Sequence, residues 1–118
     1  MGLFRRKPKV TAPKPDAAYS YPQTQNYRGF KRIKLSSYGY QPALDGIRAL
    51  ADADLSDATI KISIYEDESP RGMVSVGAHE VGTIWRHSFD QFGALKNGKI
   101  SALHLEIRDG ESYLFYKI

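Results

Sequence analysis

Histidines and carboxylates are the side chains to test first for catalytic or metal-binding chemistry. His79 and Glu80 are adjacent, but no second histidine follows four residues after the first, as a zinc-protease helix requires. Glu66, Asp67 and Glu68 share one stretch, yet their spacing is not that of the oxygen ligands in a calcium site. Nothing in the sequence predicts a dry cleft that would shift their pKa values. These residues therefore do not indicate an active site or a metal site.

Other reaction classes lack their motifs in this chain. There is no cysteine, which excludes disulfides, thiolate zinc sites and cysteine nucleophiles. There is also no Gly-rich phosphate loop and no Gly-x-Ser-x-Gly nucleophile motif. We therefore expect a non-enzymatic protein without a cofactor, and the lack of cysteine fits a cytoplasmic location.

Basic and aromatic side chains indicate binding instead. Residues 1–34 contain nine Lys or Arg against one Asp, a net charge of +8, whereas residues 35–118 contain eight against twelve acidic residues, a net charge of −4. Basic side chains contact phosphates, and aromatic rings stack on the bases of single strands. The candidate nucleic-acid contacts are Arg5, Arg6, Lys7, Lys9, Lys31, Arg32, Lys34, Tyr38, Tyr40, Trp85, Tyr113 and Phe115.

Two regions must position these residues. Residues 1–27 are rich in Pro, Lys, Gln and Ser and poor in aliphatic residues, which predicts a disordered basic arm. Tyrosines at positions 19, 21 and 27 are interleaved with this polar sequence. Residues 28–118 predict a single small β-rich domain.

The sequence of this domain predicts two hairpins, two further strands and two short helices. Alternation predicts strands over residues 31–36 and 59–66, and a hairpin over residues 72–85 with a four-residue connection. An apolar face at helical spacing predicts a helix over residues 42–53, weakened by Gly46. Ser88 and Gln91 have the spacing of a capping box at the start of a second helix. The expected fold is α+β and mainly β: a small, strongly bent antiparallel sheet or partly open β-barrel.

The last hairpin turns at Asp109 and Gly110, a strong hairpin signal, with Arg108 paired to Glu111. This register gives one face to the core: Leu103, Leu105, Ile107, Leu114, Tyr116 and Ile118. The opposite face collects His104, Glu106, Arg108, Tyr113, Phe115 and Lys117. That aromatic face is either covered by the helix over residues 42–53 or free as a binding surface.

The order of elements after residue 59 resembles the HIRAN domain, a small β-barrel-like module. Residues 60–64 and 73–76 resemble its first two strands, and Val81-Gly82-Thr83-Ile84 matches its Val-Gly-x-Ile segment. Residues 88–95 resemble its helix and residues 100–107 its closing strand, whereas residues 66–72 lack the Arg, Asn and final Asp of the family loop. The resemblance implies capture of DNA ends in single-stranded form.

Two functions follow as alternatives. The first is a non-enzymatic module that binds single-stranded DNA or another nucleic acid. The second is a protein-interaction or structural accessory module, of phage or mobile-element type, whose acidic body docks a partner. Deleting residues 1–27 should abolish nucleic-acid affinity in the first case and leave partner binding intact in the second. No apolar run approaches the roughly 20 residues of a membrane helix, although the basic arm could also meet an anionic membrane surface.

Overall fold

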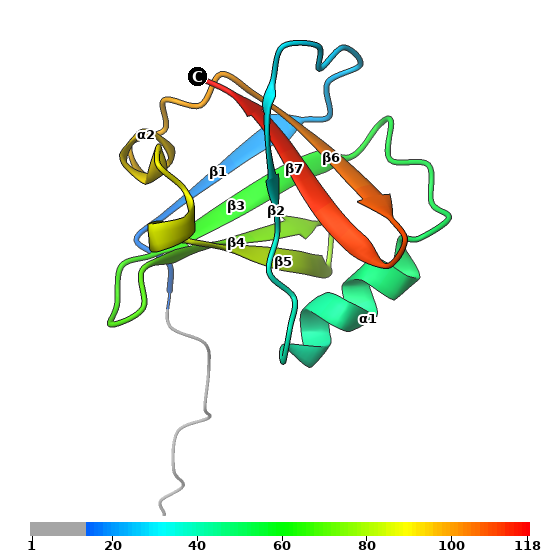
Figure 1. Ribbon diagram of the computed structural model, residues 1–118, viewed down its shortest axis with the longest axis horizontal. Helices are drawn as coiled ribbons and strands as arrows, with labels where there is room; N and C mark the ends of the chain where they lie inside the picture. The colour runs from blue at the N-terminus through cyan, green and yellow to red at the C-terminus, as the bar shows by residue number, and fades with distance from the viewer. Residues whose placement is uncertain (1–13) are drawn as a thin grey trace, which may run out of the picture.

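Seven strands and two short helices form the part of the chain that the computed structural model describes, residues 14–118 (Figure 1). The first four elements are β1 (Ala17–Pro22), β2 (Lys31–Lys34), α1 (Gln41–Ala49) and β3 (Thr59–Tyr65). They are followed by β4 (Arg71–Val76), β5 (His79–Trp85), the 3₁₀ turn η1 (Arg86–Ser88), α2 (Phe92–Lys96), β6 (Ala102–Arg108) and β7 (Glu111–Lys117).

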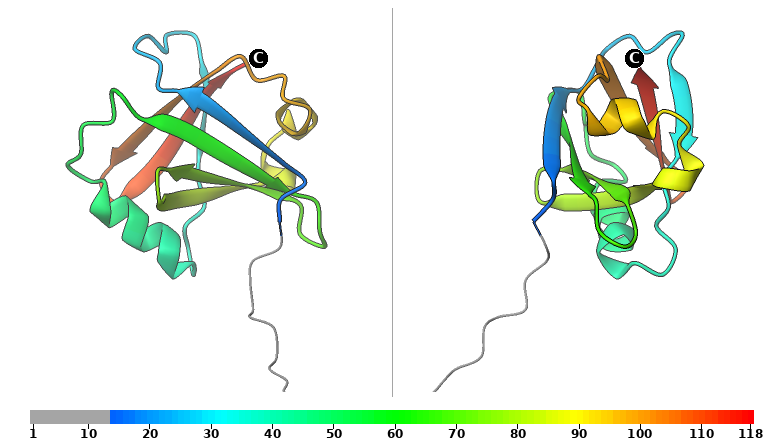
Figure 2. Two further views of the ribbon diagram at one scale, coloured as in Figure 1. Left: turned by 180° about the vertical axis from the view of Figure 1, so that it is seen from behind. Right: turned by 90° about the vertical axis from the view of Figure 1, so that its left-hand side faces the viewer.

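The strands form two antiparallel sheets that face each other across the core. One sheet has the order β1-β3-β4-β5 and the other the order β2-β7-β6. Figure 1 views the second sheet from the front, and Figure 2 shows β1 and β3 from behind. Isolated bridges join the sheets at both sides, Ser36 to Thr83 and Gln23 to Leu103. The expected mainly β fold is confirmed, and its architecture is a partly open barrel.

The first seam joins β5 to the segment after β2. Ser36 and Thr83 exchange both backbone hydrogen bonds, at 3.0 and 2.9 Å. The buried Ser112 hydroxyl donates to the Val81 carbonyl at 2.5 Å. Gly82 has a φ of 153°, and a Cβ there would lie 2.5 Å from the Leu35 Cβ. Only glycine therefore allows the two sheets to approach this closely at Gly82.

The second seam combines the Gln23 side chain with a backbone hydrogen bond from Thr24. Gln23 follows β1, and its amide Nε2 donates to the Leu105 carbonyl at 2.8 Å while its Oε1 accepts from the Leu105 N–H at 3.0 Å. The Thr24 N–H donates to the Leu103 carbonyl at 3.2 Å. The Gln23 amide thus serves the free edge of β6 as a strand backbone would, and closes the barrel on this side.

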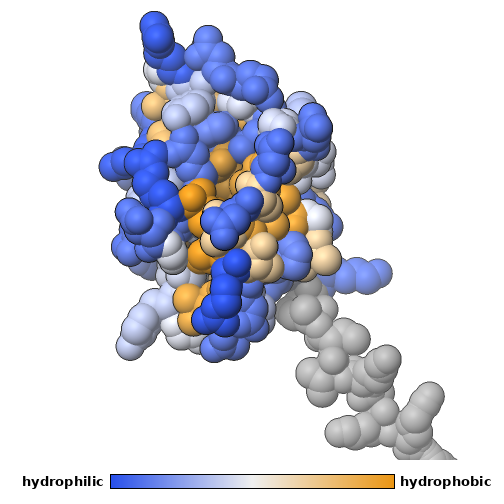
Figure 3. Space-filling model, turned by 90° about the vertical axis from the view of Figure 1, so that its right-hand side faces the viewer, coloured by the Kyte–Doolittle hydropathy of each residue, from blue (hydrophilic) through white to orange (hydrophobic). Residues whose placement is uncertain are grey.

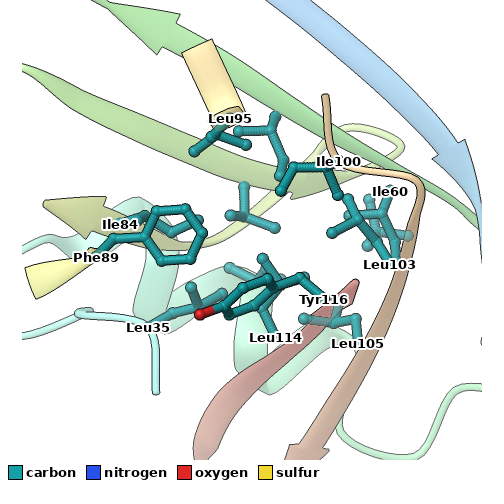
Figure 4. Packing of buried hydrophobic residues seen from close by; sticks show 14 of the residues in the cluster. Leu35, Ile60, Ile84, Phe89, Leu95, Ile100, Leu103, Leu105, Leu114 and Tyr116 are labelled. Atoms are coloured by element: carbon teal, nitrogen blue, oxygen red, sulfur yellow. The ribbon is translucent and has the colours of Figure 1, made fainter. Parts of the chain in front are cut away.

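The core lies between the two sheets. Its largest fully buried side chains include Ile60, Ile62 and Ile64 from β3 together with Leu103, Leu105 and Leu114 from the second sheet. The Phe89 and Tyr116 rings meet edge-on, with their centroids 4.7 Å apart. Figure 4 shows these two rings in the core together with Leu35 and Leu114. The predicted inward faces of residues 59–66 and of the last hairpin are confirmed, except at its end: Ile118 is 55% exposed, because it lies beyond the end of β7.

Helix α1 packs on β5 through Gly46. The helix ends at Ala49, four residues before the predicted end, and buries Ala43, Gly46 and Ile47. A Cβ on Gly46 would lie 1.9 Å from the Glu80 carbonyl oxygen. The glycine that weakens the helix pattern is therefore what lets α1 reach the strand.

The second predicted helix has a different start. Residues 86–88 form η1, and α2 begins only at Phe92. Neither element has a side-chain cap hydrogen bond, so the predicted capping box of Ser88 and Gln91 is wrong. The Gln91 side chain instead accepts a hydrogen bond from the Tyr116 hydroxyl at 2.9 Å.

The connection in the central hairpin is shorter than the four residues predicted, because Val76 pairs directly with His79.

Strand β1 lies in the region predicted to be disordered. The prediction is wrong for Ala17–Pro22, which pair with β3 over six residues. Tyr19 and Tyr21 pack against the core, and the Tyr19 hydroxyl donates to the Lys96 carbonyl at 2.7 Å. Buried tyrosine area offsets the ordering entropy that composition alone predicts to dominate. The predicted disorder of residues 1–13 lies outside the described residues. No helix within residues 14–118 combines the length and apolar character needed to cross a membrane.

Candidate nucleic-acid interface

The outward side of the β2-β7-β6 sheet gathers basic and aromatic side chains in two rows. Arg32, Phe115 and His104 are directly opposite one another across the three strands. Lys34, Tyr113 and Glu106 form the next row. Directly opposed residues of an antiparallel sheet point to the same side. We call these six residues the outer face.

Part of the outer face is covered, but by Tyr27 and not by α1. The Tyr27 ring stacks on His104 with centroids 3.8 Å apart and an interplanar angle of 8°. It also meets the Phe115 ring at 4.7 Å in a tilted arrangement. Helix α1 packs on β5, in the other sheet, so it does not form the cover that we considered. Tyr27 therefore belongs to the folded domain and extends its aromatic surface.

Glu106 anchors this aromatic cluster from within the sheet. The Tyr27 hydroxyl and the Arg108 guanidinium both donate to its carboxylate, and His104 Nε2 lies 3.3 Å from Glu106 Oε2. Burial raises the pKa of the Glu106 carboxyl, but the hydrogen bonds from Tyr27, Arg108 and His104 outweigh it, and the pKa lies below its ordinary value. The hydrogen bond between Tyr27 and Glu106 raises the pKa of the Tyr27 hydroxyl. Glu106 is therefore ionised at neutral pH and can accept these hydrogen bonds.

Arginines flank Tyr113. The Arg32 and Arg108 guanidinium carbons lie 5.3 and 5.7 Å from its ring centroid. Arg108 is paired with Glu106, and Lys34 forms an ion pair with Glu111 at 2.8 Å, which raises the pKa of Lys34. Arg32 is exposed and has no ion pair among residues 14–118. Its guanidinium is thus available to a phosphate.

A hollow of about 410 Å³ adjoins the outer face beside Phe115. Its lining residues are Gln25, Asn26, Tyr27, Arg28, Phe30 and Phe115. We call it the Tyr27–Phe30 hollow. Our list of candidate contacts missed Arg28 and Phe30, because both precede the first predicted strand. The pair Arg28-Gly29 between two aromatic residues was the signal that marked a turn at this place.

The structure brings together four of the predicted contacts and separates the others. Arg32, Lys34, Tyr113 and Phe115 share the outer face. Lys31 is opposite Tyr116, so by register it lies on the side of β2 that Ile33 shares and not on the side of Arg32 and Lys34, although its side chain is exposed. The candidates Arg5, Arg6, Lys7 and Lys9 lie outside the described residues.

The remaining aromatic candidates lie outside the two rows of the outer face. Tyr38 is 97% exposed and lines a hollow of about 500 Å³ whose other lining residues include Lys34, at the end of the outer face, Leu44 and the β6–β7 turn. Trp85 lines a separate hollow of about 630 Å³ with Pro70 and His87. Tyr40 donates a hydrogen bond to the Glu80 carboxylate at 2.6 Å. These three rings therefore do not extend the aromatic cluster of Tyr27, His104 and Phe115.

Metal chemistry has no site in the part of the chain that is described. Among residues 14–118 no group of three or more His, Cys, Asp or Glu side chains is arranged to hold a metal ion. His104, the histidine of the outer face, has Nδ1 3.1 Å from the Thr24 carbonyl oxygen. Its ring thus has structural partners on both nitrogens. Comparison of the chain with family models, curated proteins and solved structures finds no match.

Proposed function

We propose that this chain is a non-enzymatic module that binds single-stranded nucleic acid, with single-stranded DNA as the first ligand to test. This is the function that the resemblance to HIRAN domains implies. The observation that carries the proposal is the outer face, where Arg32 and Arg108 flank Tyr113. Beside Tyr113, the Tyr27 ring stacks on His104, and both rings lie tilted against Phe115. Cations supply phosphate contacts, and ring faces supply stacking that every base can use.

The arrangement favours a single strand over a duplex. The aromatic side chains lie on the three-stranded sheet, and no element of residues 14–118 projects from this face as a helix that could enter a major groove. Stacking on Phe115 or Tyr113 requires bases that are not already paired and stacked on neighbours. Tyr113 and Phe115 are two residues apart on β7, a separation of about 7 Å along the strand. This spacing suits two bases of one extended chain.

The test is fluorescence anisotropy with a labelled oligonucleotide of about eight nucleotides. Arg32→Gln should weaken binding and reduce the slope of log affinity against log salt by about 0.7. Arg48→Gln is the matched control. Arg48 is also an exposed arginine, but it lies on α1, and this helix packs on the other sheet. Equal effects of the two substitutions would show that only net charge matters and would refute the outer face as the site.

The basic arm needs its own test. Deleting residues 1–27, as the sequence suggested, also removes β1 and Gln23, so loss of binding would then report unfolding. Replacing Arg5, Arg6, Lys7 and Lys9 by Gln in the full chain leaves every residue of β1 and Gln23 in place. Under the proposal, this variant loses salt-dependent affinity but keeps the difference between Arg32→Gln and Arg48→Gln.

A protein-interaction module is the second candidate function. Figure 3 shows hydrophobic atoms grouped in the middle of the face where α1 lies, with hydrophilic atoms around them. The nearly fully exposed ring of Tyr38 also supports a protein partner. A photo-reactive amino acid at position 38 that cross-links to a protein in cells, with no oligonucleotide binding in the anisotropy test, would favour this function over the first.

A further inference from the structure

The Tyr27–Phe30 hollow has the volume of a small-ligand site and a lining rich in aromatic and amide side chains. Its volume of about 410 Å³ lies within the range of roughly 300 to 1,000 Å³ of small-ligand sites. Three of its six lining residues are aromatic, two are amides, and Arg28 is the charged one. A flat ring with polar edges and one attached negative charge complements that set of side chains. No carboxylate in the lining opposes an anion.

A rigid turn forms one wall of the hollow. The Phe30 N–H donates to the Tyr27 carbonyl at 3.1 Å, and Gly29 has a φ of 84°, as the third residue of a type II turn requires. Tyr27 is held by its stacking on His104 and its hydrogen bond to Glu106. Phe30 and Phe115 are partly exposed. The aromatic wall is therefore formed before a ligand arrives, which lowers the entropy cost of binding.

The amides offer hydrogen bonds of both kinds. Asn26 Oδ1 accepts from the Arg28 N–H at 3.1 Å, which leaves the Asn26 amide nitrogen without a partner among residues 14–118. Gln25 Nε2 donates to the Ser56 carbonyl at 3.4 Å, which leaves Gln25 Oε1 without one in the same part of the chain. A donor and an acceptor from the lining of one hollow match the polar groups on the edge of an unpaired base. An apolar protein side chain would leave both groups unused.

From these features we infer that the Tyr27–Phe30 hollow binds a single unpaired nucleobase, with the adjoining phosphate on Arg28. The subsite rests on the proposed function, because the rest of the strand crosses the outer face. The base stacks between Phe30 and Phe115, and its polar edge meets Gln25 and Asn26. Arg28, at the second position of the turn, is exposed on the same side.

The first experiment compares two probes. One is labelled oligo-dT of about eight nucleotides, and the other is a deoxyribose-phosphate chain of the same length without bases. Phe30→Ala should weaken oligo-dT binding about 5- to 100-fold and change binding of the baseless chain less than twofold. Arg28→Gln should weaken both probes equally. Tyr38→Ala, which removes an exposed ring elsewhere, should leave both affinities unchanged.

The second experiment locates the base directly. Oligo-dT with one 5-iododeoxyuridine is cross-linked to the full chain by light, and the modified peptide is identified by mass spectrometry. We expect the cross-link within residues 25–30 or at Phe115. The product should be lost in Phe30→Leu, a variant that keeps most of the apolar volume and serves if Phe30→Ala does not fold.

The outcomes separate the subsite from the proposed function. Oligonucleotide binding that is unaffected by Phe30→Ala and Phe30→Leu, with cross-links only elsewhere, would overturn the subsite and leave the proposed function standing. No binding of either probe would overturn both. Equal loss of affinity for the two probes in a folded Phe30 variant would also overturn the subsite, because base stacking would then not be what Phe30 contributes.

Discussion

Replacing Gly46 by Ala should destabilise the barrel, although alanine is the better helix former. A Cβ at position 46 would lie 1.9 Å from the Glu80 carbonyl oxygen and 2.9 Å from its carbonyl carbon. Because carbon atoms pack at about 3.5 to 4.0 Å, α1 would have to move away from β5 by more than 1 Å. The obstacle is backbone, which cannot rotate aside as a side chain can.

The magnitude follows from two opposing terms. Alanine favours the helix by about 1 kcal/mol over glycine. Overpacking costs about 1 to 3 kcal/mol, and more where backbone must shift, because moving α1 also loosens the buried Ala43 and Ile47. We expect a net loss of about 2 kcal/mol in the free energy of unfolding, or roughly 8 °C in Tm.

The assay is urea unfolding followed by the fluorescence of Trp85, the chain's single tryptophan, at the end of β5. Gly93→Ala is the matched control: Gly93 lies in α2, and apart from its chain neighbours and the backbone of its own helix nothing lies within 4 Å of its Cβ position. The control should be neutral or stabilised by up to about 1 kcal/mol. A Gly46→Ala chain as stable as Gly93→Ala would refute the close contact between α1 and β5.

The remaining predictions concern the seam and two carboxylate partners. Gln23→Glu should lower the free energy of unfolding by about 1 to 3 kcal/mol at neutral pH, because a carboxylate cannot donate a hydrogen bond to the Leu105 carbonyl. The control Gln25→Glu should change the urea midpoint little. The lowered pKa of Glu106 stabilises the fold above its ordinary pKa, and this stability is lost as pH falls through the folded value; the acid loss in urea midpoint should shrink in Glu106→Gln. The hydrogen bond to Glu80, and after it burial, raise the pKa of Tyr40 to about 12. The contribution of Tyr40 to the free energy of unfolding is therefore complete below pH 10 and is lost as the pH rises from 10.0 toward 12. Tyr40→Phe should lack this loss in alkaline unfolding, and a pH profile identical to that of the unsubstituted chain would contradict the hydrogen bond.

Local patterns predicted much of the barrel. The strand over residues 59–66 and the hairpin at Asp109 and Gly110 were correct because a side-chain period of two and a turn with positive φ at both central residues are properties of adjacent residues. The errors came where a distant partner decides. Ala17–Pro22 form a strand because β3, some forty residues later, pairs with them and buries Tyr19 and Tyr21.

The candidate site divides in the same way. The sequence identified Arg32, Lys34, Tyr113 and Phe115 by residue type and alternation, and the register confirmed that they share a face. It could not separate them from Tyr38, Tyr40 and Trp85, because residue type carries no information about which surface a loop or strand end occupies. Tyr27, Arg28 and Phe30 enter the site through contacts with distant residues, among them the stacking of Tyr27 on His104, 77 positions away.

By itself the sequence determined the class of the fold, the inward faces of its longest strands and the absence of thiol chemistry, because each depends on composition or on neighbours along the chain. The tertiary structure alone decided how the barrel closes. Gln23 must meet Leu105, Gly46 must meet Glu80 and Gly82 must meet Leu35, and each contact joins residues far apart in sequence. Such contacts depend on the packing of two sheets and a helix in three dimensions, which no local pattern records.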